Sequence, residues 1–181
     1  MQMNYSELYK PLYHGSDVSF SVIDLSKSSH KKDFGSGFYT TTDKNQAEKF
    51  ACLKAKRIYA NKGYVEVFNL NDLSNLSIKI FDSADEEWFN FVLHNRAYKK
   101  FAASGLNEVF DIVIGPIAND AVGLVLNQYI AGVYGDPLSA ESKTTAIRLL
   151  LTQKLHNQVF FGTEKAILRL NYIEAYDVYI E

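Results

Sequence analysis

The chain has 181 residues, of which 47% are hydrophobic and 22% are charged, a composition typical of one compact domain that needs no disulfide or metal for its core. Its 21 acidic and 19 basic residues give a net charge of -2, so the chain as a whole has no electrostatic attraction to nucleic acid or to anionic membranes. The 12 Tyr and 12 Phe residues favour a sheet-rich core and suit a pocket for a flat ligand.

The N-terminus and the single cysteine indicate where the protein works. Residues 1–11 are polar and lack the apolar stretch of a signal peptide, and no run approaches the ~18 apolar residues of a membrane span. Cys52 has no partner for an intramolecular disulfide, and its place in a helical pattern favours packing over a nucleophilic role. No Cys/His cluster has the spacing of zinc ligands. We therefore expect one domain over residues 1–181, cytoplasmic, without a metal and without membrane association.

The first half of the chain shows strand patterns around one clear helix. Four strands are predicted, over residues 8–14, 38–42, 64–70 and 76–81. Asp43 with Gln46 three residues later resembles a capping box, and apolar residues behind it recur at helical spacing. Lys62 and Gly63 are expected to end that helix before the third strand.

The second half alternates helices and strands. Asp82 and Ser83 resemble the cap of a helix whose apolar stripe continues to Phe101. Two further helices are predicted over residues 120–131 and 139–151. Three strands are predicted over residues 111–114, 158–161 and 172–180, with a helical turn before the last. Strands mixed with helices, without an internal repeat, indicate an α+β domain.

Three short segments place residues with useful chemistry in predicted strands. They read LYHGS, FGSGFY and NQVFF, and they contain His14, Tyr39 and Gln158 respectively. A histidine at a strand end can donate a hydrogen bond to a sugar hydroxyl, and Gly15 after it lets a ligand approach the backbone closely. Each segment alone is more typical of a structural histidine, a turn or a surface amide.

In this order the three segments resemble the NAD motifs of the ADP-ribosyltransferase fold. The resemblance is to its His-Tyr-Glu branch, which includes poly(ADP-ribose) polymerases and diphtheria-toxin-like enzymes. The whole chain is most similar to a small bacterial family of this fold, which also has segments like residues 42–47 and 112–116. The resemblance implies two small, mainly antiparallel sheets that form a cleft, with flanking helices.

The resemblance also implies a role for each matching residue. His14 would bond the adenine-side ribose, the backbone of Gly15 would hold the nicotinamide carboxamide, and Tyr39 would stack on the nicotinamide ring. Phe50 matches a second stacking aromatic of the polymerase-like members, and the alternative for it is a core position on an amphipathic helix. Two further residues are expected to shape the pocket, Ser16 and Thr40.

The third motif departs from the family, because Gln158 stands where the polymerising enzymes have a catalytic Glu. Gln can accept a hydrogen bond from the ribose hydroxyl, but it brings no charge to the oxocarbenium-like state and cannot act as a base. Position 160 is Phe, so the Gln-x-Glu arrangement of arginine-modifying branches is absent, and Glu164 is the nearest carboxylate. Single transfer therefore fits better than polymerisation, and Gln158→Glu is expected to raise NAD cleavage.

The leading expectation is an NAD-dependent mono-ADP-ribosyltransferase with His14, Tyr39 and Gln158 as its catalytic set. NAD is its substrate, and the acceptor is a protein or a nucleic acid. Analogy with the frequent uses of the fold adds a bacterial toxin with an antitoxin protein as partner. Two alternatives stay open. One is a catalytically weak module that binds NAD or ADP-ribose, which Gln158 favours, and the other is an NAD glycohydrolase with water as acceptor.

Overall fold

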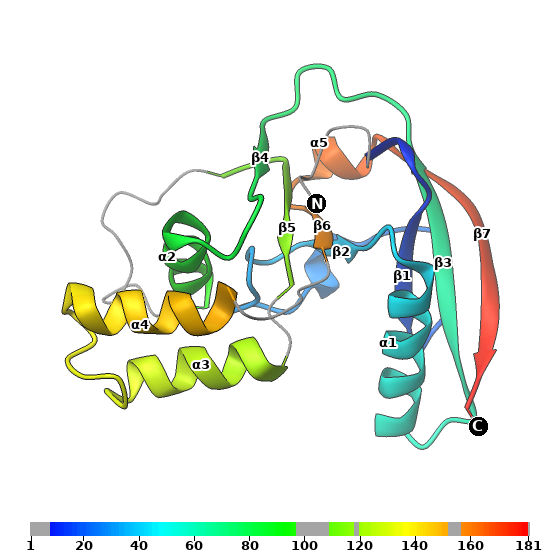
Figure 1. Cartoon of the computed structure of the whole chain (residues 1–181). Helices are drawn as coiled ribbons and strands as arrows, with labels where there is room; N and C mark the ends of the chain where they lie inside the picture. The colour runs from blue at the N-terminus through cyan, green and yellow to red at the C-terminus, as the bar shows by residue number, and fades with distance from the viewer. Residues whose placement is uncertain (1–7, 97–108, 118–119, 152–156, 181) are drawn as a thin grey trace.

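The computed structural model describes residues 8–96, 109–117, 120–151 and 157–180 (Figure 1). Its strands are β1 (Leu12–Ser16), β2 (Phe38–Thr40), β3 (Lys62–Leu70), β4 (Ile78–Ile80), β5 (Ile112–Pro116), β6 (Asn157–Phe161) and β7 (Leu170–Tyr179). Its helices are α1 (Lys44–Arg57), α2 (Glu86–Asn95), α3 (Asp120–Ile130), α4 (Ala140–Leu151) and α5 (Glu164–Ile167), and a short 3-10 turn, η2, covers Leu25–Lys27.

The strands form two small sheets in an α+β fold. One sheet has the order β1-β3-β7 and the other the order β2-β6-β5-β4. Among the described strands, β4 and β5 pair in parallel and the other neighbours pair antiparallel, as expected. Strands β3 and β4, which residues 71–77 connect, belong to different sheets and do not form a hairpin. Within the described ranges, no helix is long and apolar enough to cross a membrane.

Helix α1 begins where the sequence predicts. The Asp43 side chain accepts a hydrogen bond from the Gln46 backbone N–H at 3.2 Å. The Gln46 side chain does not complete a capping box, because its Oε1 accepts from the Thr41 hydroxyl at 2.9 Å. Helix α2 begins later than predicted, since Asp85 and not the Asp82–Ser83 pair caps it. The predicted continuation of this helix to Phe101 lies outside the described residues.

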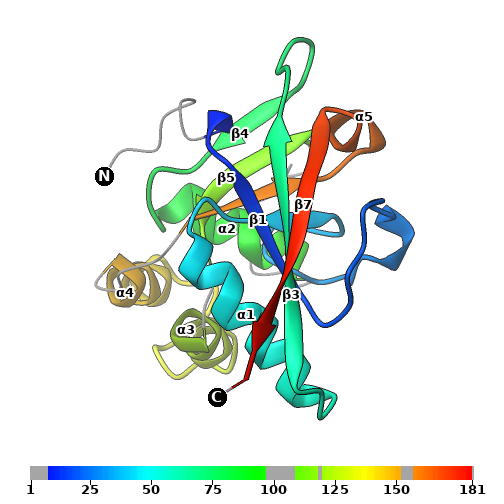
Figure 2. The ribbon, with the colours of Figure 1, turned by 90° about the vertical axis from the view of Figure 1, so that its right-hand side faces the viewer.

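The buried face of α1 is made of small residues that let its backbone lie against the β1-β3-β7 sheet (Figure 2). A Cβ atom at Gly15 of β1 would lie 2.2 Å from the Ala47 carbonyl oxygen, and one at Gly63 of β3 would lie 2.6 Å from that of Ala51. The absent side chain of Gly15 therefore makes room for a helix. Gly15 also extends β1 where the sequence suggested a strand end.

Replacing Gly15 with Ala is expected to lower the free energy of unfolding by about 1–3 kcal/mol, because the added methyl group meets helix backbone and not a flexible side chain. Gly123→Ala in α3 is the matched control. Nothing lies within 4 Å of a Cβ atom there, so the same change should stabilise by up to about 1 kcal/mol. Chemical denaturation measures both changes, and an equal effect at the two positions would contradict the close contact.

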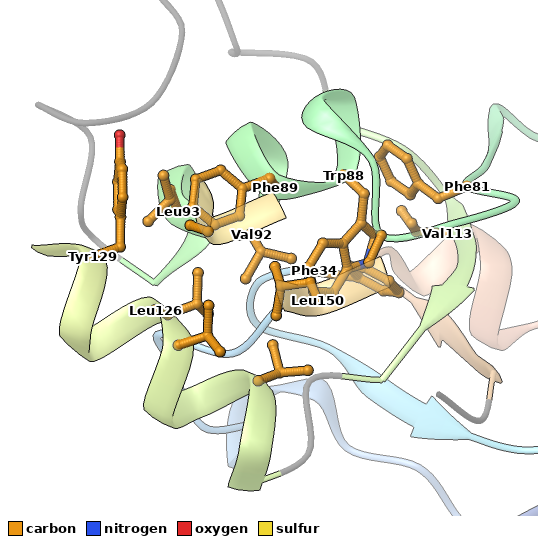
Figure 3. Packing of buried hydrophobic residues seen from close by; sticks show 14 of the residues in the cluster. Phe34, Phe81, Trp88, Phe89, Val92, Leu93, Val113, Leu126, Tyr129 and Leu150 are labelled. Atoms are coloured by element: carbon orange, nitrogen blue, oxygen red, sulfur yellow. The ribbon is translucent and has the colours of Figure 1, made fainter. Parts of the chain in front are cut away.

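Two buried clusters hold the sheets in place. Helices α2, α3 and α4 cover one face of the β2-β6-β5-β4 sheet, and residues such as Trp88, Leu126 and Leu150 fill the space between them (Figure 3). The second cluster combines residues of both sheets, among them Leu12, Phe68, Ile112, Val159 and Phe161. The relative positions of β1, β2 and β6, which carry the three motifs, are thus fixed by apolar burial.

Candidate functional site

The two sheets meet where β1 and β2 lie side by side, at a place we call the strand junction (residues 13–15 and 39–41). The Tyr13 N–H donates to the Thr41 carbonyl oxygen at 2.8 Å, and the Thr41 N–H donates to that of Tyr13 at 2.9 Å. In a regular antiparallel ladder the next such pair would be Gly15 with Tyr39. The pair of Gly15 with Tyr39 is not formed, and His14 Nδ1 lies 2.6 Å from the Tyr39 carbonyl oxygen instead.

The end of this bridge determines where the backbone groups of Gly15 point. In an antiparallel strand, the N–H and C=O of one residue point to one side and those of its neighbours to the other. Tyr13 directs both groups away from β3 and toward Thr41, so Gly15, two residues later, also directs both away from β3. Within the described residues, no backbone hydrogen bond to another segment uses these two groups. They form a donor–acceptor pair on the side of β1 that is turned away from β3, and Gly15 itself is buried.

His14 is a neutral ring held in one tautomer. Its imidazole stacks on Phe38 with ring centroids 4.6 Å apart and contacts the edge of Phe20 at 5.6 Å. Burial, with a smaller contribution from the Lys54 ammonium, lowers the pKa of His14 to about 4. A carbonyl oxygen only accepts, so Nδ1 carries the proton and Nε2 is an acceptor. The expected donor role of His14 is therefore corrected: at neutral pH Nε2 can accept a hydrogen bond but not donate one.

The Tyr39 side chain is fixed by the loop that precedes it. Its hydroxyl donates to the Gly35 carbonyl oxygen at 2.7 Å and accepts from the Phe34 backbone N–H at 3.1 Å. The ring packs on Phe160 with centroids 4.9 Å apart, and the Lys32 ammonium lies 5.1 Å from the ring centroid. Burial raises the pKa of the Tyr39 hydroxyl, which is therefore neutral and serves as a hydrogen-bonding group.

The rings of His14 and Tyr39 point to opposite sides of β2. His14 stacks on Phe38, and successive residues of a strand direct their side chains to opposite faces. The structure thus brings His14 to the backbone of Tyr39 and leaves their rings on different sides. The sequence predicted the proximity but not this arrangement.

Gln158 shares the face of the sheet on which Tyr39 lies. Phe160 of β6 pairs with Tyr39 of β2, and Gln158 is two residues before Phe160 in the same strand. The Gln158 side chain is buried, with 6% of its surface exposed, so the interpretation as a surface amide is wrong. Its Nε2 lies 3.4 Å from Oδ2 of Asp33. A carboxylate therefore lies next to the Gln158 amide.

Asp33 forms a buried ion pair that the sequence did not predict. The Arg96 guanidinium, at the C-terminal end of α2, donates to Asp33 Oδ1 through Nε at 2.7 Å, and its second nitrogen lies 2.6 Å from the same oxygen. The Asp33 and Arg96 side chains are 10% and 23% exposed. The only signal in the sequence is that Asp33 directly precedes the FGSGFY segment, where it was assigned no role.

The remaining predicted pocket residues lie around the junction but have local partners. The Ser16 hydroxyl accepts from the Val18 backbone N–H at 3.3 Å, and the Thr40 hydroxyl donates to the Val159 carbonyl oxygen at 3.2 Å. Phe50 is 45% exposed, so its core interpretation is wrong. Glu164 is exposed in the first turn of α5, which follows the C-terminal end of β6. Gln158 lies near the N-terminal end of β6, so the fold does not bring Glu164 to it.

A second buried carboxylate, Glu66, lies next to His14 and was also missed. Glu66 of β3 is directly opposite His14 of β1 in the antiparallel register and is fully buried. Among the described residues, neither of its carboxylate oxygens has a hydrogen-bond partner of ordinary geometry. Burial raises the pKa of Glu66 to about 7, and the nearby backbone amides of Glu66 and Phe20 and the Lys54 ammonium offset only part of the rise.

A hollow of about 540 Å³ lies away from the junction, on the face of α1 that is turned from its buried alanines. Its lining consists of helix residues: Asn45, Glu48, Lys49, Cys52, Leu53 and Lys56. We do not assign the site to this hollow, because it contains none of the motif residues.

Comparison with known proteins gives one family. The sequence profile of the family described as "Protein of unknown function (DUF3990)" matches residues 11–172. No curated protein and no solved structure matches the chain. The matched range includes the strand junction, Asp33 and Gln158, so the family shares the whole segment in which the candidate site lies.

Proposed function

We propose that this chain, which belongs to the DUF3990 family, binds NAD at the strand junction and transfers its ADP-ribose group to a macromolecular acceptor. The observation that carries the proposal is the N–H and C=O pair of Gly15, which points away from β3, beside the neutral ring of His14. The three motifs come from distant parts of the sequence, and their strands are neighbours in the fold.

The backbone N–H and C=O pair of Gly15 is complementary to a carboxamide. The nicotinamide carboxamide has one carbonyl acceptor and one NH₂ donor, so it can pair with an N–H and a C=O that point the same way. His14 Nε2, one residue earlier, is an acceptor suited to a ribose hydroxyl. A nicotinamide nucleotide has both groups, a carboxamide on its ring and hydroxyls on its ribose.

Stacking of nicotinamide on Tyr39 requires Lys32 to move. The Lys32 ammonium now lies over the ring of Tyr39, and an exposed contact of this kind is worth about 0.5–1 kcal/mol. Stacking of a flat ring on an aromatic side chain is worth about 1–3 kcal/mol, so the exchange favours the ligand. The ligand must also reach the side of β2 on which Phe160 lies.

In the proposed reaction, the bond between C1′ of the nicotinamide ribose and the ring nitrogen breaks, and nicotinamide leaves with the bonding electron pair. The acceptor nucleophile attacks C1′ and gives up its proton. Gln158 would accept a hydrogen bond from the ribose 2′-hydroxyl through its amide oxygen, without adding charge. A neutral amide at this position supports a single transfer over chain elongation, which needs a base for each sugar hydroxyl.

The same amide supports a second candidate function, a module that binds NAD or ADP-ribose with little turnover. Hydrolysis, with water as the acceptor, is the third. A protein or nucleic-acid acceptor, a cytoplasmic toxin role and an antitoxin partner rest on the resemblance of the motifs alone.

One experiment separates the three functions. The protein is incubated with NAD labelled in its adenine ring, with and without host lysate. Label on a macromolecule supports transfer, free ADP-ribose supports hydrolysis, and retained binding without turnover supports the binding module. If NAD neither binds nor reacts, the site itself is wrong.

We expect His14→Ala to lower kcat/KM for NAD about tenfold, because the ribose loses one acceptor and the Tyr39 carbonyl loses its donor. His30→Ala is the matched control, since His30 is exposed in the preceding loop and contacts Ser36. Initial rates of nicotinamide release measure both variants. A His14→Ala protein that remains folded and reacts as fast as the parent would remove His14 from the site.

A further inference from the structure

We propose that Asp33 is the positioning residue of Gln158: it holds the amide NH₂ group and so turns the amide oxygen toward the substrate. This inference rests on the proposed function. It concerns a residue outside the three motifs, and the argument for it is the placement of one carboxylate between a guanidinium and an amide.

The two oxygens of Asp33 have separate partners. Arg96 occupies Oδ1 with two of its nitrogens, and Oδ2 faces Gln158 Nε2 at 3.4 Å. As whole residues, Asp33 is 7% exposed and Gln158 is 6% exposed. Both groups are therefore buried, where a polar atom without a partner is costly.

The chemistry of the pair determines which way the amide lies. An ionised carboxylate only accepts hydrogen bonds, so an amide rotated by half a turn would bring two acceptor oxygens together. Asp33 therefore selects the orientation in which Gln158 Nε2 points inward, which leaves Oε1 for a ligand. An acceptor is what the 2′-hydroxyl of the nicotinamide ribose requires.

Asp33 also changes the effect expected of a glutamate at position 158. In Gln158→Glu, two carboxylates would lie within hydrogen-bonding distance, and such a pair holds a shared proton instead of ionising fully. The new Glu would then add little negative charge at neutral pH. The gain in NAD cleavage expected from the sequence should appear only when Asp33 is also replaced.

The test replaces the carboxylate of Asp33 with an amide and, in a double variant, also replaces the amide of Gln158 with a carboxylate. In Asp33→Asn we expect the Asn side-chain oxygen to accept from the Arg96 guanidinium, so that the Asn NH₂ group faces Gln158. The Gln158 amide then rotates by half a turn, because its oxygen and not its NH₂ group pairs with that donor. We expect kcat for NAD cleavage to fall about 10- to 100-fold, with a nearly unchanged Kd. In the double variant Asp33→Asn/Gln158→Glu, the Asn NH₂ donates to the new carboxylate. Its kcat should exceed that of either single variant at least tenfold.

The pH profile distinguishes positioning from a structural role. Activity of Gln158→Glu alone should rise with pH over a higher range than that of the double variant, because its carboxylate shares a proton with Asp33. Asp24→Asn is the matched control, an exposed carboxylate in the same loop whose replacement should leave kcat unchanged. Parent-like kcat in Asp33→Asn, or a double variant no faster than the single ones, would overturn the inference.

A measurement without turnover keeps the two proposals separate. The side-chain NH₂ signals of Gln158 in an ¹⁵N–¹H NMR spectrum are identified by their loss in Gln158→Glu. They should shift in Asp33→Asn and stay in place in Asp24→Asn, with no NAD present. If no variant consumes NAD, the transferase proposal fails, and these signals decide the role of Asp33 alone. Unmoved signals in Asp33→Asn would overturn it.

Discussion

Replacing Glu66 with Gln should raise the free energy of unfolding by about 2–3 kcal/mol at about pH 8 and change it little near pH 4. Glu66 is fully buried opposite His14, and within the described part of the chain its carboxylate oxygens have no hydrogen-bond partner of ordinary geometry. Above its pKa of about 7 the folded protein must hold a buried negative charge, which an amide of the same shape avoids.

The direction of the pH dependence follows from the raised pKa. Between the ordinary value of 4.5 and about 7, the folded state binds the Glu66 proton more tightly than the unfolded state. The contribution of Glu66 to stability is therefore full below 4.5 and is lost as the pH rises through about 7. His14, with its lowered pKa, acts in the opposite direction between about 4 and 6.5, and it does so in both the parent and the variant.

Urea denaturation at several pH values between about 4 and 8 measures the effect. Glu174→Gln is the matched control, because Glu174 lies exposed on β7, and its replacement should change stability little at any pH. A difference between parent and Glu66→Gln that does not grow with pH would show that the Glu66 carboxylate is solvated or paired in solution.

The second large effect is expected at Arg96. Arg96→Met should lower the free energy of unfolding by about 3 kcal/mol at neutral pH, because it removes the guanidinium that pairs with the buried Asp33 carboxylate. Lys62→Met, which breaks the more exposed pair with Asp177, should cost less than about 1 kcal/mol. Thermal or chemical unfolding of the two variants gives the comparison directly.

A double-mutant cycle assigns the loss to the pair. If the cost of Arg96→Met comes from an uncompensated charge, Asp33→Asn in the same chain should recover most of it. If it comes from lost packing of the Arg96 stem, the two substitutions should simply add. Additive costs would also weaken the inference about Gln158, since they would mean that Asp33 is not held by Arg96.

Local features of the fold were predictable, because their causes are local. Asp43 caps α1 through a residue three positions later, and the helical spacing behind it places Ala47, Ala51 and Ala55 on one face, which is the buried one. The segments around His14, Tyr39 and Gln158 could be identified as strands because each has β-branched or aromatic residues next to turn residues. Proximity of His14 to Tyr39 followed from the resemblance of the motifs.

The rest of the site depends on contacts between distant segments. Asp33 meets Arg96 and Gln158, which are 63 and 125 positions away, and no local pattern marks such a partner. Glu66 alternates with apolar residues in β3, as an exposed strand residue would, and only the pairing with β1 shows that it is buried. The close packing of α1 on Gly15 was not predictable, because no local motif shows which helix lies against a given strand.

The pairing of β2 with β6 also determines when the site can form during synthesis of the chain. Tyr39 lies opposite Phe160 in the second sheet. The ribosome therefore adds β6, the strand that pairs with β2, roughly ten seconds after the first two motifs. Until then β2 has an uncovered edge and Asp33 has no Gln158 to hold. The nascent chain therefore lacks Gln158 beside the junction during most of its synthesis, and the same is true of any product that ends before β6.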